Sequence, residues 1–398
     1  MNPFESFEVA RLPEIHFGSG TFDRLPEILQ RYGRSVLLVT GAASLQRTPR
    51  WQRLLDAIDA AGLQWQHVAV GGEPTPELVD GAVERFAATA IDVVAGIGGG
   101  SALDAAKAIA GLLRSGTRVL DHLEGVGRGQ PYTGPATPFV AVPTTAGTGS
   151  EATKNAVLSR QGEDGFKKSF RHPDLVAQIA IVDPDLLDSC PKHLVAANGM
   201  DAFTQLLESY VSLRASPFTD ALASSGMQAF RDGFWPAWTD DDPMAKTGYQ
   251  RLAYASLCSG ITLAQCGLGS VHGLASPLGA FFPIPHGVVC GTLVAEATRV
   301  NIHALRQRQA DGPALRKYAE AGTLLSGHPF VDETAAQDGL VELLDTWTDR
   351  LALPRLREFG VTDRDIPRIV ANCRGGSMQT NPLVLDDDEL AGLVAARL

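Results

Sequence analysis

The feature that most constrains the fold of this chain is a change of pattern between its two halves. In the first half, short apolar runs at residues 35–40 and 91–97 flank a segment of helical pattern at residues 51–62. Such alternation is typical of the strands and crossover helices of a parallel sheet. Two further apolar runs, at residues 139–142 and 177–182, suit strands that helices cover on both faces.

After about residue 194 the pattern becomes helical, with long stretches rich in Ala, Leu and Glu, such as residues 202–214 and 220–230. A chain of 398 residues also exceeds what one hydrophobic core usually supports. We therefore expect two domains, an α/β domain with a parallel sheet over residues 1–191 and an all-helical domain over residues 192–398.

The composition argues for small-molecule chemistry. The net charge is −11 and the isoelectric point is about 5.3, whereas nucleic acids and anionic membranes bind basic surfaces, so we expect neither as a partner. No apolar run reaches the roughly eighteen residues that cross a bilayer, and charged residues interrupt the start of the chain. We expect no membrane span and no export signal.

The cysteines indicate a reducing, cytoplasmic setting. They are odd in number, widely scattered, and form no CxxC pair. Nothing in their pattern favours a thiolate nucleophile, so each is interpreted as a small buried apolar residue without a catalytic role. The five residues are Cys190, Cys258, Cys266, Cys290 and Cys373.

A glycine turn carries the strongest local signal in the first half. Gly98-Gly99-Gly100-Ser101 follows an apolar run and opens a helical segment at residues 102–113. Glycines let a backbone approach a ligand closely, and the free N–H groups at a helix start attract a pyrophosphate. Glycines also serve simple strand-to-helix turns, so this motif by itself leaves both interpretations open.

A second loop strengthens the case for a nucleotide site. Residues 143–151 follow another predicted strand and carry the hydroxyl groups of Thr144, Thr145, Thr148 and Ser150 among small residues. These hydroxyls can bond phosphate or ribose. Both loops stand at the carboxyl ends of strands, where open α/β sheets bind their ligands, so we expect both to contact one cofactor.

The second half holds candidate metal ligands. Asp201 and Gln205 are four residues apart near the start of a helical segment and therefore share a face. His272 lies in an apolar helical segment, and His286 follows Pro285. A lone histidine on an apolar face is more often a core residue than a ligand, but the set of four favours a metal site.

Four motifs in this order resemble the iron-containing alcohol dehydrogenase family, and the resemblance covers nearly the whole chain. It implies a dehydroquinate synthase-like fold, with a dinucleotide-binding first domain and an all-helical second domain. It also implies an NAD(P)-dependent oxidoreductase that acts on an alcohol or aldehyde. The motifs are GGGSxxDxAK at residues 98–107, PTTAGTGSE at residues 143–151, GMDAxxxxxE at residues 199–208 and HxxxxPLGAxxxxPHG at residues 272–287.

The resemblance also assigns roles to single residues. The pyrophosphate of the cofactor is expected on the glycine turn, and Asp104 and Lys168 are expected to join the cofactor site. The family holds its metal with one Asp and three His, and these positions correspond to Asp201, Gln205, His272 and His286. Here Gln205 replaces a histidine.

A second departure from the family is Ser276, which stands where a further active-site histidine is usual. The remaining Asp201, His272 and His286 still form a two-His, one-carboxylate set that suits Fe(II) or Zn(II), with Gln205 adding a neutral amide oxygen. We expect a metal-polarised alcohol or carbonyl to exchange hydride with nicotinamide, with these three residues and Ser276 as the catalytic set. Ser276, ribose hydroxyls and water remain open as the proton route.

Three other interpretations remain open at this point. The chain could be a metal-independent reductase of the maleylacetate reductase type, a catalytically silent nucleotide-binding homologue, or a lyase related to dehydroquinate synthase. The retention of Asp201, His272 and His286 favours the metal-dependent dehydrogenase.

Cofactor choice depends on the end of the run at residues 35–40. Relatives that prefer NAD often place an Asp at the position of Gly41, where its charge repels a 2′-phosphate. Gly41 leaves room, Ser44 can bond a phosphate, and Arg47 and Arg50 stand nearby. We expect NADP(H) to be accepted and slightly favoured over NAD(H). Family resemblance also implies a homo-oligomer.

Overall fold

The computed structural model describes residues 6–239 and 243–398. By its internal contacts the chain divides into two compact units. The α/β unit comprises Ala10–Arg160 and Phe166–Cys190, and the helical unit comprises Pro191–Leu398 together with the short segments 6–9 and Gln161–Gly165. The sequence predicted a single boundary after residue 191. In the structure, two short segments before that boundary also belong to the helical unit.

The α/β unit is built on a six-stranded sheet, in which the strands follow the order β1-β8-β5-β4-β2-β3. Every pairing in this sheet is parallel, which confirms the expected fold class. The strands are β1 (Glu14–Phe17), β2 (Ser35–Gly41), β3 (Gln64–Val70), β4 (Val93–Gly98), β5 (Phe139–Pro143) and β8 (Ile179–Val182).

Strands β1 and β3 were not predicted from the sequence. Both are edge strands of this sheet, and most of their residues are at least partly exposed. An edge strand tolerates polar side chains such as Glu14, His16 and Gln66, so it lacks the unbroken apolar run that identifies the central strands.

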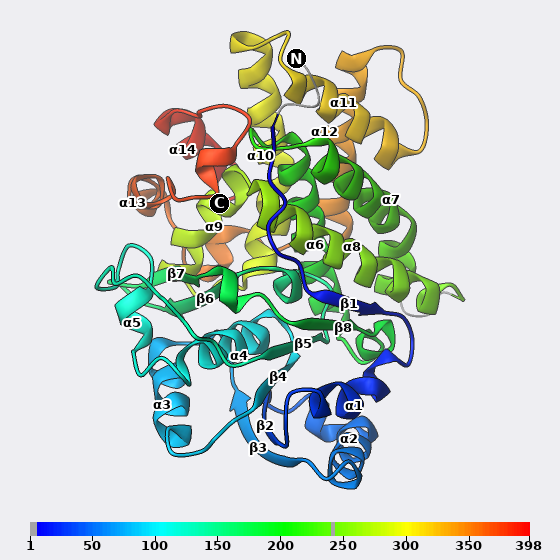
Figure 1. Cartoon of the computed structure of the whole chain (residues 1–398). Helices are drawn as coiled ribbons and strands as arrows, with labels where there is room; N and C mark the ends of the chain where they lie inside the picture. The colour runs from blue at the N-terminus through cyan, green and yellow to red at the C-terminus, as the bar shows by residue number, and fades with distance from the viewer. Residues whose placement is uncertain (1–5, 240–242) are drawn as a thin grey trace. The chain divides into compact units, whose positions relative to one another are not determined.

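Helices cover both faces of the sheet, as Figure 1 shows. Alternate residues of β2 pack into two separate cores: Leu37 and Val39 into one core with α3 and α4, and Val36 and Leu38 into the other with α1 and α2. This alternation follows from the two-residue period of a strand. The helices are α1 (Leu25–Gln30), α2 (Pro49–Ala60), α3 (Pro76–Phe86) and α4 (Gly100–Leu112).

An antiparallel hairpin, also absent from the sequence predictions, follows the second predicted loop. Its strands are β6 (Asn155–Arg160) and β7 (Phe166–Arg171). The backbone N–H of Val157 donates to Oδ2 of Asp104 at 3.1 Å, which ties the hairpin to α4. The short helix α5 (Val119–His122) lies between α4 and β5 in the chain.

The helical unit confirms the helical pattern of the second half. Close packing of α7 on α8 depends on Gly233 and Gly248, because a Cβ on either would lie within 2.9 Å of the other's carbonyl oxygen. The helices are α6 (Lys192–Val211), α7 (Pro217–Thr239), α8 (Ala245–Cys266), α9 (Ser270–Phe281), α10 (His286–Arg308), α11 (Pro313–Ser326), α12 (Glu333–Arg350), α13 (Ile366–Asn372) and α14 (Asp387–Ala395).

Within the described residues, no single helix is both long and apolar enough to cross a membrane. Helices α8 and α9 pass that test only when they are joined, and they meet at a bend of 98°.

Candidate cofactor and metal sites

The glycine turn lies where β4 ends and α4 begins. Gly98 is the last residue of β4, and a Cβ there would lie 2.6 Å from Cβ of Ala102 and 3.3 Å from the backbone nitrogen of Gly41. Only glycine therefore allows the end of β2, the end of β4 and the first turn of α4 to lie so close together.

The two predicted loops pack directly on each other. A Cβ on Gly99 would lie 3.2 Å from Oγ1 of Thr145, and one on Gly100 would lie 2.6 Å from Cγ2 of Thr148. The backbone N–H of Thr144 donates to the carbonyl of Gly98 at 3.0 Å. The structure thus brings the glycine turn and the threonine loop together at the carboxyl ends of β4 and β5, while Ser101 lies in the first turn of α4.

Asp104 and Ser150 bond to each other. Oγ of Ser150 donates to Oδ1 of Asp104 at 2.5 Å. The buried ammonium of Lys107 donates to the carbonyls of Ser150 and Asn155 at 2.8 and 2.7 Å and to Oγ1 of Thr153 at 3.0 Å. Both predicted residues therefore support the shape of the threonine loop from within. Lys107 belongs to the quoted motif, but no role was assigned to it from the sequence.

The other predicted cofactor residues are spread along the unit. Gly41 ends β2, and Ser44 is exposed just after it. The guanidinium of Arg50 donates to both carboxylate oxygens of Asp188, at 2.9 and 2.6 Å, and is therefore already paired. Arg47 is exposed. Lys168 lies on β7, opposite Leu158 and outside the group of contacts that joins the two loops.

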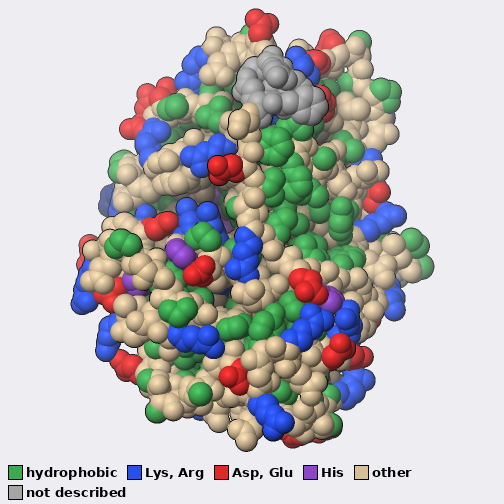
Figure 2. Space-filling view, in the orientation of Figure 1, with side chains coloured by type: hydrophobic (Ala, Val, Ile, Leu, Met, Phe, Trp, Pro, Cys, Tyr) green, Lys and Arg blue, Asp and Glu red, His purple; other side chains and the backbone are tan. Residues whose placement is uncertain are grey.

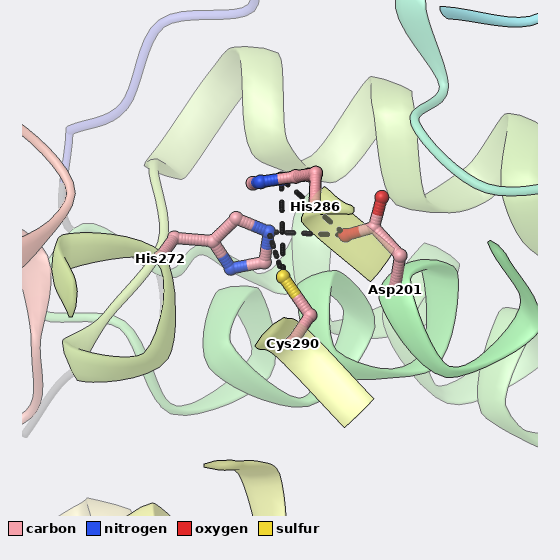
Figure 3. Close-up of side chains that lie close together, drawn as sticks. All are labelled: Asp201, His272, His286 and Cys290. Atoms are coloured by element: carbon pink, nitrogen blue, oxygen red, sulfur yellow. Dashed lines mark hydrogen bonds and ion pairs between the residues drawn. The ribbon is translucent and has the colours of Figure 1, made fainter. Parts of the chain in front are cut away.

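The helical unit gathers four side chains into one cluster, shown in Figure 3. The potential ligand atoms of Asp201, His272, His286 and Cys290 all lie within 4.8 Å of one another. Oδ1 of Asp201 is 3.2 Å from Nε2 of His272 and 3.8 Å from Nε2 of His286. Asp201, His272 and Cys290 are buried, whereas the His286 side chain is 27% exposed.

The charge of Asp201 follows from its neighbours. Burial opposes its ionisation, but the positive charges of His286 and His272 hold the pKa of the carboxyl at about 2, so it is a carboxylate at neutral pH. Burial raises the pKa of the Cys290 thiol to about 12, so the thiol keeps its proton when the cluster holds no cation.

Gln205 does not point into the cluster as a ligand. Its Nε2 donates to Oδ1 of Asp201 at 3.1 Å, and its Oε1 accepts from Oγ of Ser259 at 2.8 Å. Reversing the amide would set its oxygen against the carboxylate of Asp201, so the hydrogen bonds support the orientation seen. The sequence led us to expect the Gln205 amide oxygen as a metal ligand, but in this arrangement that oxygen accepts a hydrogen bond from Ser259.

Glu208 holds His272 in place, a role that the sequence did not reveal. Its Oε2 lies 2.5 Å from Nδ1 of His272, and its Oε1 accepts from the backbone N–H of Val271 at 2.7 Å. Because Glu208 engages Nδ1, Nε2 is the ring nitrogen that faces Asp201, and it becomes available to a metal once it loses its proton. The available signal was the spacing of Asp201, Gln205 and Glu208, which puts all three on one face of α6.

Asn381 also binds the start of α9, next to the contact that Glu208 makes there. Oδ1 of Asn381 accepts from the backbone N–H of Ser270 at 3.0 Å. Gly269 is required here, because a Cβ would lie 2.8 Å from that oxygen and 3.0 Å from Oε1 of Glu208. Ser276, one turn after His272 on α9, is partly buried.

Cys290 is buried, as the sequence interpretation of the cysteines predicts, but it lies beside two histidines. Sγ of Cys290 lies 3.6 Å from Nε2 of His272 and 3.8 Å from Nε2 of His286. The missed signal was the spacing of His286 and Cys290, which are one helical turn apart on α10.

Comparison with known proteins agrees with this architecture. Residues 13–184 match the family profile of iron-containing alcohol dehydrogenase, and residues 195–398 match that of the C-terminal part of the Fe-containing alcohol dehydrogenase family. Lactaldehyde reductase of Escherichia coli is 30% identical over 370 residues, which cover 91% of this chain and 92% of that protein.

Solved structures of similar fold span the whole chain. A 1,3-propanediol oxidoreductase has a TM-score of 0.88 at 26% identity and covers 99% of this chain and 100% of its own. A sulfoacetaldehyde reductase from Bifidobacterium kashiwanohense, solved in complex with NAD+, has a TM-score of 0.82 at 25% identity and covers 99% of each chain.

A parallel sheet with a glycine turn at its carboxyl edge, followed by helices with a buried histidine and carboxylate cluster, is the architecture of a nicotinamide-dependent dehydrogenase with a metal centre. The chain belongs to the iron-containing alcohol dehydrogenase family. It is an oxidoreductase that acts on CH–OH and C=O groups, and its family uses NAD(P) and a metal.

Proposed function

We propose that this enzyme interconverts a small alcohol and its aldehyde, using NAD(P)(H) and one divalent metal ion, Fe(II) or Zn(II), that Asp201, His272 and His286 hold. The observation that carries the proposal is the buried cluster on α6, α9 and α10, whose donor atoms converge from residues far apart in the sequence.

The donor set fits a metal ion. Asp201 is ionised, and Glu208 engages Nδ1 of His272, which leaves Nε2 of that ring as the metal-binding atom. Two imidazoles and a carboxylate suit Fe(II) and Zn(II). When bound, the metal supplies Lewis acidity that stabilises the alkoxide formed during hydride transfer with nicotinamide.

The protein itself contributes binding and orientation. The glycine turn with Gly98, Gly99, Gly100 and Ser101 presents the N-terminus of α4 to the pyrophosphate, and the loop with Thr144, Thr145 and Thr148 packs against this turn. Asp104 and Ser150 hold that loop in shape, and Lys168 remains a proposed cofactor contact on β7.

Ser276 is the proposed protein group for proton transfer. It lies on α9, one helical turn after His272, and it is partly buried. Its hydroxyl can donate and accept a hydrogen bond, so it can relay a proton to a ribose hydroxyl or to water. The side chain would then do part of the work of the histidine that the family usually has there.

For the cofactor we propose that NADP(H) is accepted and slightly favoured over NAD(H). A Cβ on Gly41 would meet only Oγ of Ser44, at 3.9 Å, so the end of β2 leaves space for a 2′-phosphate. Arg50 is paired with Asp188, which leaves Arg47, exposed beside Ser44, as the cation available to a phosphate.

A metal-independent reductase is the second candidate, and the cluster argues against it. Asp201, His272 and His286 are the kinds of side chain that bind Fe(II) or Zn(II), and a metal-independent reductase has no need to gather them. The decisive experiment measures metal content after gentle purification together with oxidation of NAD(P)H by a panel of aldehydes. We expect about one ion per chain and turnover that His272→Ala abolishes. Full activity in metal-free protein would refute the metal-dependent function.

We further propose that the enzyme forms a homo-oligomer in the cytoplasm and binds no nucleic acid or membrane. The proposed contact between subunits is supported by the apolar side chain of Ile15, which is 37% exposed on the edge strand β1. Figure 2 shows acidic and basic side chains interspersed over one face and hydrophobic side chains gathered over the helical unit. All five cysteines are free, which suits a reducing compartment.

A further inference from the structure

Two helices each present a pair of polar side chains to the cluster at a spacing of one turn. Helix α6 carries Asp201 and Gln205, and helix α10 carries His286 and Cys290. On α6 the second member of the pair, Gln205, is engaged with Asp201 and Ser259. On α10 the second member, Cys290, is fully buried and directs its sulfur at the histidines, as Figure 3 shows.

We propose that the Cys290 thiolate is the fourth ligand of the metal, so that the site is an Asp–His–His–Cys centre selective for Zn(II), with Gln205 only positioning Asp201. This inference rests on the proposed function, because it specifies the ligands of the same metal ion. The fourth ligand would then come from α10, whereas the family's ligand position, occupied here by Gln205, lies on α6.

Four of the six distances within the cluster are close to those of a tetrahedral zinc centre. With Zn–N near 2.05 Å and Zn–S near 2.3 Å, a tetrahedron separates nitrogen from sulfur by about 3.5 Å and nitrogen from oxygen by about 3.3 Å. The sulfur of Cys290 lies 3.6 and 3.8 Å from Nε2 of His272 and His286. Oδ1 of Asp201 lies 3.2 and 3.8 Å from the same nitrogens.

Gln205 cannot take this place without breaking its own contacts. Its amide oxygen accepts from Oγ of Ser259 at 2.8 Å, and its NH2 group donates to Oδ1 of Asp201 at 3.1 Å. To bind a cation through its oxygen, the amide must give up both hydrogen bonds in a buried setting. Cys290 needs no such change, since its sulfur already faces both histidines.

A thiolate changes which metal the site prefers. Thiolate sulfur is a softer donor than an amide oxygen and favours zinc over iron(II) at such a centre. Binding displaces the thiol proton to solvent, because a coordinated thiol is deprotonated. Catalytic zinc usually has three protein ligands and an open position, but its coordination can expand to five, which leaves room for a substrate oxygen beside four protein donors. Of the four side chains in the cluster, that of His286 is the most exposed, at 27%.

Cobalt(II) substitution tests this ligand set directly. The full-length protein is stripped with a chelator and titrated with Co(II) under anaerobic conditions. We expect visible d–d bands together with a thiolate-to-cobalt charge-transfer band in the near ultraviolet. Cys290→Ser should lose the charge-transfer band and bind Zn(II) at least about tenfold more weakly, since even residues that merely orient ligands contribute that much. Cys258→Ser, which changes another buried cysteine, serves as the matched control and should keep the band.

The outcomes separate this inference from the proposed function. Wild-type d–d bands without a charge-transfer band would show a metal site that lacks sulfur, which overturns the inference and leaves the proposed function intact. No cobalt spectrum at all would refute both. Gln205→His in the Cys290→Ser background should restore Zn(II) affinity without the charge-transfer band. If the double variant binds Zn(II) no more tightly than Cys290→Ser, a histidine on α6 does not replace the sulfur on α10. That result would contradict the proposed change of the fourth ligand from one helix to the other.

Discussion

At the scale of single residues, Glu151 couples protonation to folding. It is 2% exposed, and its Oε1 has no hydrogen-bond partner within the described residues. Burial raises its pKa to about 7, although its backbone hydrogen bond and nearby Lys107 oppose the shift. The folded protein therefore holds the proton more tightly than the unfolded chain, whose Glu titrates near 4.5. This stabilisation is complete below pH 4.5 and is lost as the pH rises through 7.

We predict that Glu151→Gln flattens this dependence. The variant should match the wild type near pH 4.5 and exceed its free energy of unfolding at pH 8, by at most about 3 kcal/mol, because the amide stays neutral. Denaturant unfolding at several pH values measures the difference. Parallel pH profiles for the two proteins would contradict the assignment of the shift to Glu151.

The proposed cofactor choice is also tested at one residue, Gly41. We predict that Gly41→Asp lowers kcat/KM for NADP(H) at least about tenfold while NAD(H) use changes little, because a carboxylate repels the 2′-phosphate. The substitution is sterically mild, since a Cβ at Gly41 would meet only Ser44 at 3.9 Å. Steady-state kinetics with both cofactors measure the effect, and Gly41→Asn, of the same size without the charge, is the control. A clear preference of the wild type for NAD(H) would refute the proposed cofactor choice.

At the scale of elements, the cofactor site depends on the contact between the β4–α4 turn and the threonine loop. A Cβ on Gly100 would lie 2.6 and 2.8 Å from the side-chain atoms of Thr148. We predict that Gly100→Ala costs about 1–3 kcal/mol of stability, as overpacking does, and weakens cofactor binding. Thermal unfolding and cofactor titration measure both effects.

A double variant, Gly100→Ala with Thr148→Ala, tests whether the collision with Thr148 causes the loss of stability. Removing Oγ1 and Cγ2 of Thr148 removes the two closest contacts, so stability should recover by more than half. Equal losses in the single and the double variant would mean that the collision with Thr148 is not the cause.

At the scale of the whole molecule, the metal is expected to stabilise the fold. The cluster joins α6, α9 and α10 through Asp201, His272 and His286. Free Zn(II) at 100 times its Kd should stabilise the native state by about 2.7 kcal/mol, and a chelator should lower the Tm accordingly. Differential scanning calorimetry measures this. His272→Ala is the control, and a chelator effect of the same size in that variant would place the stabilising ion elsewhere.

Assembly is a second property of the whole molecule. The apolar Ile15 is 37% exposed on the edge strand β1, and an unpaired strand edge is a surface on which a second chain can pair. We predict that the wild type is at least a dimer and that Ile15→Lys shifts it toward the monomer. Light scattering after size-exclusion chromatography measures the mass. A monomeric wild type would refute the homo-oligomer.

The sequence alone determined the fold class, the positions of the central strands and those of a few helices, among them α2 and α4. Apolar periodicity is a local property, so residues 35–40 and 139–142 indicate buried strands without knowledge of their neighbours. The edge strands and the hairpin of β6 and β7 were missed, because one-sided exposure removes the unbroken apolar pattern.

Within the site, the sequence determined which residues are candidates, and the tertiary structure decided what each contacts. Asp201, His272 and His286 could be named from their motifs, but three helices must pack before Cys290 lies 3.6 Å from His272. The orientation of Gln205 likewise depends on Ser259, 54 residues away on α8. Contacts between residues so distant in sequence arise only from packing, so no local pattern reveals them.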